Sequence, residues 1–189
     1  MKKIDKKSFR KEQIAVRNAI SEQKRLEKSR KIMSMLKETA AFKKADNIMC
    51  FVSFASEVYT HDFIKECIKS GKNVIVPYID KEKDTMDLSL IKSFFELESG
   101  FFGILEPKKE TIRDFPKEEL DIIVTPCVAF DSEKYRIGYG KGYYDRFFAK
   151  GAGGTKIGVC FSENLVDNMP RDEFDIPVDM VITDEKIIN

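Results

Sequence analysis

The stretch NIMCFVSFASEVYTHDFIKECIKSGKNVIVPY, residues 47–78, decides the fold. It opens with a continuous apolar run at 47–54 and closes with another at 73–78, and both have the length of a buried strand. Between them, residues 60–70 predict a helix that ends at Gly71. Strands of continuous rather than alternating apolar character are typical of a parallel sheet covered on both faces. We therefore predict two strands of a mainly parallel sheet, joined by a helix.

Similar patterns extend in both directions from this stretch. Residues 5–20 predict a helix with Phe9, Val16 and Ile20 on one face. Ser21 is then a candidate N-cap for a second helix, whose apolar positions are Leu26, Met33 and Leu36. Further elements are predicted as strands at 87–94, 121–126, 156–161 and 179–184, a glycine-containing loop at 98–107 and a helix at 142–150.

The chain of 189 residues is 42% hydrophobic and 34% charged, which is typical of a globular protein. It shows no repeat or interdomain linker, so we predict a single domain, 1–189, in which basic helices within 1–45 pack on the α/β core. No apolar run approaches the roughly 20 residues of a membrane span, and the polar start MKKIDKKSFRKEQ does not resemble a secretory signal. We therefore expect a cytoplasmic protein without a membrane partner.

Cysteine and histidine exclude several kinds of site. The four cysteines are widely spaced and form no C-x-x-C motif, so we expect reduced thiols rather than a zinc site or a disulfide framework. His61 is the single histidine, and we expect it to be structural or solvated.

Positive charge is concentrated near the N-terminus. Residues 1–31 hold twelve Lys or Arg and four acids, a net charge of +8 against +1 for the whole chain. Such a run is more often a solvated helix face than a binding site. The alternative is an anionic ligand, either a polyphosphate or a nucleic acid.

The stretch RIGYGKGYYDRFF, residues 136–148, places glycines at 138, 140 and 142 among basic residues and before a predicted helix. Backbone amides in such a run can bind an anion, and glycine lets a phosphate approach closely. It is not a G-x-x-x-x-G-K-[ST] loop, and Tyr143 occupies the third glycine position of the dinucleotide fingerprint. Three glycines alone would also suit a hairpin without a ligand.

The longer stretch FDSEKYRIGYGKGYYDRFF, residues 130–148, closely resembles the signature of the 5-formyltetrahydrofolate cyclo-ligase family. The resemblance extends over nearly the whole chain, through KKSFRKEQIAVR (6–17), FVSFASEVYT (51–60), VIVPYI (74–79), GFFGILEP (100–107), KIGVCF (156–161) and DEFDIPVDMVIT (172–183). The chain departs from the family pattern at Tyr59, Cys127, Lys134 and Phe174. Lys134 stands where the family usually has glycine.

This resemblance implies a three-layer α/β/α fold with a mainly parallel central sheet, similar to the NagB/RpiA/CoA-transferase-like fold. It implies an enzyme that cyclises 5-formyltetrahydrofolate to 5,10-methenyltetrahydrofolate with ATP and Mg²⁺, releasing ADP and phosphate. The formyl oxygen would attack the γ-phosphate, and N10 would then close the ring. We expect small-molecule substrates, no nucleic-acid partner and a monomer.

The resemblance also implies site residues, by position. The ATP-binding residues would be Lys6, Lys7, Arg10, Arg136, Gly138, Tyr139, Gly140, Lys141, Gly142, Tyr143 and Tyr144, with Lys141 and Arg136 as catalytic cations. The Mg²⁺ ligands would be Asp145 and Asp175. The folate would contact Val52, Glu57, Tyr139, Gly140, Lys141, Gly142 and Tyr143, with Phe51, Phe54 and Phe102 as possible further walls. For Tyr143 and Tyr144, packing at the start of the helix is an equally good interpretation.

Two other functions fit parts of the pattern. The predicted order of strands and helices would also suit an enzyme acting on sugar phosphates or CoA esters, which needs neither ATP nor Mg²⁺. The basic N-terminus would suit a nucleic-acid-binding module, although the chain has no RNP-type or KH-type motif.

Overall fold

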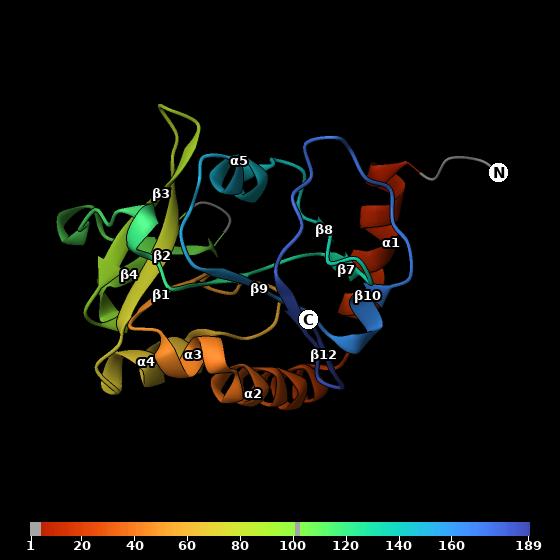
Figure 1. Ribbon diagram of the computed structural model, residues 1–189, viewed down its shortest axis with the longest axis horizontal. Coiled ribbons are helices and arrows are strands. Elements are labelled where there is room, and N and C mark those ends of the chain that lie inside the picture. The colour runs from red at the N-terminus through yellow and green to blue at the C-terminus, as the bar shows by residue number, and fades with distance from the viewer. Residues whose placement is uncertain (1–4, 101–102) are drawn as a thin grey trace.

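The computed structural model describes residues 5–100 and 103–189, which form a three-layer α/β/α arrangement around a seven-stranded sheet (Figure 1). The five central strands are parallel, and an antiparallel strand lies at each edge. This arrangement confirms the predicted fold class. In spatial order the strands are β12 (Ile187–Ile188), β11 (Met180–Ile182), β9 (Thr155–Val159), β6 (Ile122–Thr125), β1 (Asn47–Cys50), β2 (Asn73–Asp80) and β3 (Thr85–Ile91).

Helices cover both faces of the sheet (Figure 1). One face carries α2 (Glu22–Glu38), α3 (Ala40–Lys44) and α4 (His61–Lys69), and the other carries α5 (Tyr143–Ala149). The first helix, α1 (Lys6–Asn18), packs instead on a small sheet of β10 (Leu165–Val166), β7 (Ala129–Asp131) and β8 (Arg136–Ile137). A two-stranded sheet of β4 (Leu97–Ser99) and β5 (Leu105–Pro107) and the 3₁₀ turns Phe94–Glu96, Lys109–Thr111, Lys117–Glu119 and Ser162–Asn164 complete the described elements.

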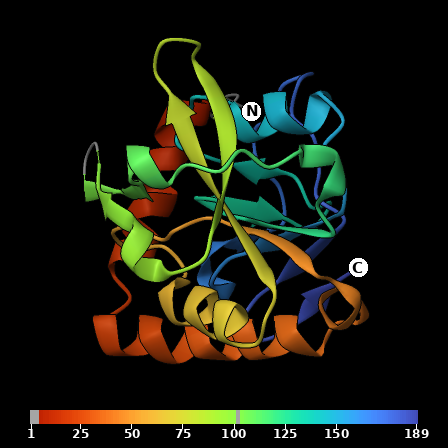
Figure 2. The same cartoon turned by 90° about the vertical axis from the view of Figure 1, so that its left-hand side faces the viewer.

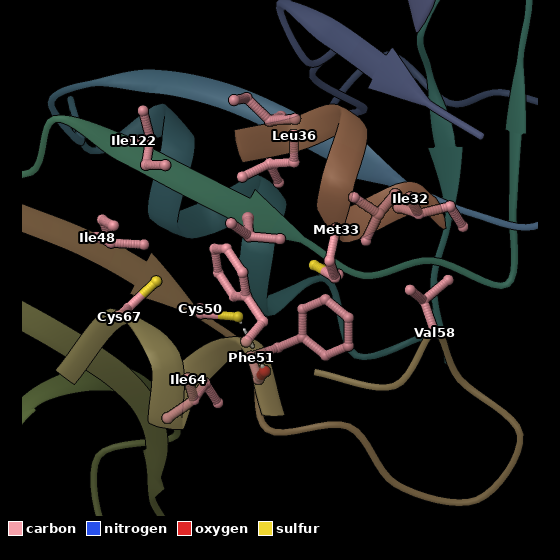
Figure 3. Close-up of a cluster of buried hydrophobic side chains, with 14 of the residues drawn as sticks. Ile32, Met33, Leu36, Ile48, Cys50, Phe51, Val58, Ile64, Cys67 and Ile122 are labelled. Carbon is pink, nitrogen blue, oxygen red and sulfur yellow. Dashed lines mark hydrogen bonds between the residues drawn. The ribbon is translucent and has the colours of Figure 1, made fainter. Parts of the chain in front are cut away.

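A continuous apolar core fixes the sheet against α2 and α4. Ile32 and Leu36 of α2, Ile48 of β1 and Ile64 of α4 are fully buried and point toward one another (Figure 3). Burying a side chain of this size contributes about 1.5–3 kcal/mol to folding. On the opposite face, a second cluster packs α5 on the sheet through Phe147 and Phe148. The core therefore holds β1 and its neighbours in a fixed frame.

The order of the strands creates a switch point beside β1. The chain passes from β1 to β2 on one side, whereas β6 lies on the other side of β1 and leads on to β9 and β11. In open α/β sheets, ligands bind at the carboxyl ends of the strands where the order reverses. Here those ends lead into residues 51–57 after β1 and residues 126–128 after β6. This edge is thus the place where a ligand site is expected.

Two local predictions were wrong. The apolar run 47–54 is a strand only as far as Cys50, where β1 ends. Beyond it, side-chain hydrogen bonds replace the backbone bonds between strands, because the Thr60 hydroxyl accepts from Ser53 N and donates to Phe51 O. In α1, Val16 is only partly buried, and the buried polar residues of that helix are Gln13 and Arg17. The predicted N-cap at Ser21 and the helix at 60–70 are confirmed.

Lys134 adopts a left-handed backbone conformation in the turn between β7 and β8, with φ of +69°. This explains why glycine is usual at the position, since a Cβ in that conformation costs about 1 kcal/mol or more. The buried carboxylate of Asp131 holds the turn by accepting hydrogen bonds from Glu133 N and Tyr135 N, each at 3.0 Å. The turn therefore forms despite the departure from the family pattern.

We expect Lys134→Gly to stabilise the protein by about 0.5–1 kcal/mol, because it removes the left-handed strain and loses only a 3.2 Å contact from Lys134 Nζ to Asp179 O. Chemical denaturation would measure the change, with Lys134→Ala as the control that loses the same contact but keeps the strain. Equal stabilities for the two variants would show that the turn carries no such strain.

Candidate active site

The glycine run lies between β8 and α5 and is held against α1. Arg10 of α1 donates from Nε to Gly138 O at 2.7 Å. Its guanidinium also lies 3.3 Å from the position that a Cβ on Gly140 would occupy, and Gly140 has φ of +104°. The backbone conformation therefore favours glycine at 140, and a Cβ there would also push the Arg10 guanidinium aside.

Gly138 has no such requirement. A Cβ at this position would meet nothing within 4 Å, and its φ lies outside the left-handed region. The fold alone would accept alanine here. A glycine that packing does not require is consistent with a backbone that a ligand must approach closely.

Lys6, at the start of α1, joins this helix to the 172–175 loop. Its ammonium lies 2.6 Å from Asp175 Oδ2 and 2.7 Å from Asp172 Oδ2. Partial burial disfavours the charged ammonium, but hydrogen bonds to the two carboxylates outweigh it and raise the pKa of Lys6. Lys6, which was predicted to bind phosphate, is thus paired in this structure with Asp175, which was predicted to bind the metal.

Arg136 points into the protein rather than toward solvent. Its guanidinium is buried and donates to Asp145 Oδ1 and to Ile176 O, each at 2.8 Å. Asp145 Oδ1 also accepts from Ile176 N at 3.1 Å. Arg136 therefore ties Asp145 to the segment that carries Asp175, which brings the two predicted metal ligands to neighbouring positions in the fold.

The loop after β1 carries Glu57, whose carboxylate is buried. Burial raises the pKa of Glu57 to about 7, although a hydrogen bond from Phe54 N and the charge of Arg17 oppose the rise. A carboxyl group with this pKa carries a proton for part of the time near neutral pH. It can then donate or accept a hydrogen bond, which suits contact with a heterocycle that has both kinds of group.

The other predicted folate-site residues lie in different surroundings. Val52 and Phe51 are buried in the core cluster shown in Figure 3, where Phe51 is labelled. Phe54 is partly exposed and its ring lies 5.3 Å from that of Tyr139. Phe102 lies outside the described residues. The Phe54–Tyr139 contact brings the Glu57 loop and the glycine run together.

The remaining residues of the glycine run divide into exposed and buried groups. Lys141 is exposed, and within the described part of the chain its ammonium forms no hydrogen bond or ion pair. Tyr143 donates to Asp84 Oδ1 at 2.8 Å, at the tip of the long β2–β3 hairpin that extends beyond the sheet (Figure 2). Tyr144 packs in the core beside Phe148, as the packing interpretation predicted. Lys7 is exposed on α1.

Two polar residues of this region were not predicted. Asp172 shares the Lys6 ammonium with Asp175, and Arg17 is buried against Ser56, Cys127 and Tyr139. Arg17 could have been found from its position in the sequence, because residues 6, 10, 13 and 17 lie along one face of a helix. The sequence gives no comparable signal for Asp172, which lies 166 positions from Lys6 in a loop.

A model of the 5-formyltetrahydrofolate cyclo-ligase family matches residues 2–184. The chain belongs to this family. It is 32% identical over 146 residues to the 5-formyltetrahydrofolate cyclo-ligase of Escherichia coli (strain K12), which covers 76% of this chain and 80% of that protein. It is 29% identical over 180 residues to a probable 5-formyltetrahydrofolate cyclo-ligase of Caenorhabditis elegans, with 89% and 87% covered.

A solved structure agrees with the family assignment. The NMR structure of Aquifex aeolicus 5,10-methenyltetrahydrofolate synthetase is 36% identical to the chain, with a TM-score of 0.85, and the comparison covers 96% of this chain and 91% of that one. Together these matches confirm the predicted family, fold class and enzyme activity. They favour the cyclo-ligase over the sugar-phosphate, CoA-ester and nucleic-acid alternatives. No helix among the described residues is long and apolar enough to cross a membrane.

The two glycines of the run give a first test. We expect Gly138→Ala to leave the melting temperature unchanged and to raise the KM for ATP about tenfold or more, because the Cβ would enter only the space that a phosphate needs. Gly140→Ala differs from Gly138→Ala because it should also destabilise the fold. We expect it to lower the free energy of unfolding by roughly 1–2 kcal/mol, through backbone strain and contact with Arg10. A normal KM for Gly138→Ala would argue against a phosphate cradle.

The pKa of Glu57 gives a second test. Between pH 4.5, the ordinary value, and about 7, the folded protein holds a proton on Glu57 that the unfolded chain has lost. Stability conferred by this group is therefore complete below pH 4.5 and is lost as the pH rises to 7. We expect the unfolding free energy of the wild type, relative to Glu57→Gln, to fall over that range by on the order of 3 kcal/mol. Parallel pH profiles would contradict the assignment.

Proposed function

We propose that the enzyme uses ATP and Mg²⁺ to convert 5-formyltetrahydrofolate to 5,10-methenyltetrahydrofolate, with release of ADP and phosphate. The formyl oxygen attacks the γ-phosphorus, forming an O–P bond as the bond to ADP breaks. N10 then attacks the activated formyl carbon and loses its proton to solvent, and phosphate leaves as the ring closes. Because the substrate supplies both nucleophiles, the protein has to position the reactants and stabilise charge.

The observation that carries this proposal is the convergence of α1, the glycine run and the 172–175 loop. Arg10 contacts Gly138, and Lys6 contacts Asp175, so the three segments assigned to nucleotide and metal meet directly. Arg10 and Lys6 would bind the triphosphate, and the open backbone at Gly138 would admit it. The exposed ammonium of Lys141 would neutralise charge on the transferred phosphoryl group. The buried Arg136 would act through Asp145 rather than on the phosphate.

The acidic residues fit a Mg²⁺ ion bound together with phosphate. Among the described residues, no group of three or more His, Cys, Asp and Glu is arranged to hold a metal. Mg²⁺, however, is commonly bound by one or two carboxylates with phosphate and water. The position of the Lys6 ammonium between Asp172 and Asp175 shows that this loop accommodates a cation. Asp145 and Asp175 would hold the metal, which neutralises phosphate charge when bound.

Glu57 would recognise the folate at the switch point. It is buried beside the carboxyl end of β1 and, with its pKa raised to about 7, can donate or accept a hydrogen bond at the polar edge of the pterin. Tyr139 would form the wall between the folate and the nucleotide, because it belongs to the glycine run and contacts Phe54 of the Glu57 loop.

Near-ultraviolet absorbance tests the reaction directly. Methenyltetrahydrofolate has a longer conjugated system than its precursor, so a new band should appear when the enzyme is mixed with 5-formyltetrahydrofolate, ATP and Mg²⁺. We expect the band to require all three. A band without ATP would contradict the proposed phosphorylation, and no band despite bound ATP would contradict the folate substrate.

Asp175→Asn tests the metal assignment in the same assay. We expect it to raise the Mg²⁺ concentration for half-maximal rate by about tenfold or more, because a ligand charge is lost. Asp172→Asn is the matched control, since Asp172 shares Lys6 but is not assigned to the metal. An equal Mg²⁺ requirement for Asp175→Asn and the wild type would remove Asp175 from the metal site.

A further inference from the structure

The side chain of Arg17 lies where the proposed folate and nucleotide regions meet. It is on the last turn of α1, and 4% of the residue is exposed. It follows Arg10 by seven positions, about two turns, and so lies on the same helix face. Lys6 and Arg10 contact the segments assigned to the metal and the nucleotide, whereas Arg17 reaches deeper, toward the switch point beside β1.

Each nitrogen of the Arg17 side chain contacts a different segment. Nε donates to Ser56 Oγ at 3.0 Å, beside Glu57 in the loop after β1. One terminal nitrogen donates to Cys127 O at 2.9 Å, after β6, and the other donates to the hydroxyl of Tyr139 in the glycine run. A guanidinium alone presents donors in such a fixed fork, and a lysine ammonium would not reach all three groups in this geometry.

The position of Tyr139 depends on few other contacts. It is 44% exposed, and its ring lies between Phe54, at 5.3 Å, and the Arg17 guanidinium, at 5.7 Å. Gly138 and Gly140 flank it, so the backbone on either side has unusual conformational freedom. Arg10 holds the backbone at the neighbouring Gly138, and the hydrogen bond and ring contact with Arg17 restrain the Tyr139 side chain itself.

Arg17 itself is placed too deeply to bind a substrate. The cavity it lines with Glu57 and Cys127 has a volume of about 10 Å³, which is no more than one water molecule occupies. A buried guanidinium is stable because its N–H groups are hydrogen-bonded. Its effect on a ligand must be transmitted by the groups it holds.

We infer that Arg17 is a positioning residue that fixes Tyr139 of the glycine run against the Glu57 loop, so that the folate wall and the nucleotide loop are assembled as one unit. This inference rests on the proposed function, because it assumes that Glu57 and Tyr139 contact the folate. It assigns α1 a second role besides binding phosphate. Arg17 sets the distance between the two substrates through Ser56, Cys127 and Tyr139.

Steady-state kinetics on four variants test the inference. Arg17→Lys keeps the positive charge but loses the fixed arrangement of guanidinium N–H donors. Tyr139→Phe removes only the hydroxyl from a partly exposed ring. We expect each to raise the KM for 5-formyltetrahydrofolate about tenfold, with a smaller change in the KM for ATP. Arg30→Lys, an exposed arginine of α2, is the matched control and should behave as wild type. Glu57→Gln reports separately on the folate site.

The double variant Arg17→Lys/Tyr139→Phe distinguishes positioning from general stabilisation. If Arg17 acts through Tyr139, the double variant should raise the folate KM no more than about threefold beyond the larger single effect. A lower melting temperature with unchanged KM values, or effects that multiply fully, would overturn the inference. If Arg17→Lys fails to fold, an unchanged KM for 5-formyltetrahydrofolate in Tyr139→Phe is sufficient to overturn the inference.

The two proposals fail in different ways. If Glu57→Gln raises the folate KM but neither Arg17→Lys nor Tyr139→Phe does, the positioning role is wrong and the folate site stands. If none of the three changes the folate KM, both the proposed folate site and the role of Arg17 are wrong.

Discussion

Three cations on one face of α1 hold the site together. Lys6, Arg10 and Arg17 contact the 172–175 loop, the glycine run and the Glu57 loop, which are far apart in the sequence. None of these segments is a regular element at its point of contact, so none has a backbone ladder to fix it. The charge-assisted bonds from α1 supply that restraint, at about 1.5–3 kcal/mol each. The basic N-terminus is therefore part of the architecture of the site, in addition to the phosphate-binding role proposed for it.

The arrangement of strands in the sheet explains why α1 can contact all three segments. Because β1 and β6 are parallel neighbours, the loops that follow them leave the sheet at the same edge. The small sheet of β7, β8 and β10 then carries the chain from β6 to the glycine run and provides the apolar surface on which α1 packs. Phe9 of α1 is buried on that surface, so its packing orients the hydrogen bonds that Lys6, Arg10 and Arg17 donate from the same helix.

The sequence specified the parts of the site that depend on local patterns. The glycine run was predicted as an anion site from its spacing and from the helix that follows it, whereas Lys6 and Arg10 were named from the resemblance to the family. Arg17 and Asp172 were missed because their partners lie across the fold, 39 or more positions away. The end of β1 at Cys50 was missed because side chains of Ser53 and Thr60 replace the ladder bonds there. The strands of the small sheet are two or three residues long, too short for any apolar period to show.

Each of the two predicted metal ligands is paired with a cation of the protein. Asp175 is neutralised by Lys6 and Asp145 by Arg136, but the two pairs differ in kind. The Arg136–Asp145 pair is anchored by the backbone of Ile176 and by a buried guanidinium, and exchanging its partners would leave a buried charge without compensation. The Lys6–Asp175 pair lies nearer to solvent, on a flexible ammonium whose bonds cost little to exchange. If Mg²⁺ and phosphate bind as proposed, the metal would take the place of Lys6 at Asp175, and the phosphate would take the place of Asp175 at Lys6. The hydrogen bonds of Asp145 to Arg136 and Ile176 use Oδ1, so Asp145 would share the metal through Oδ2 while its pair with Arg136 keeps the site in place.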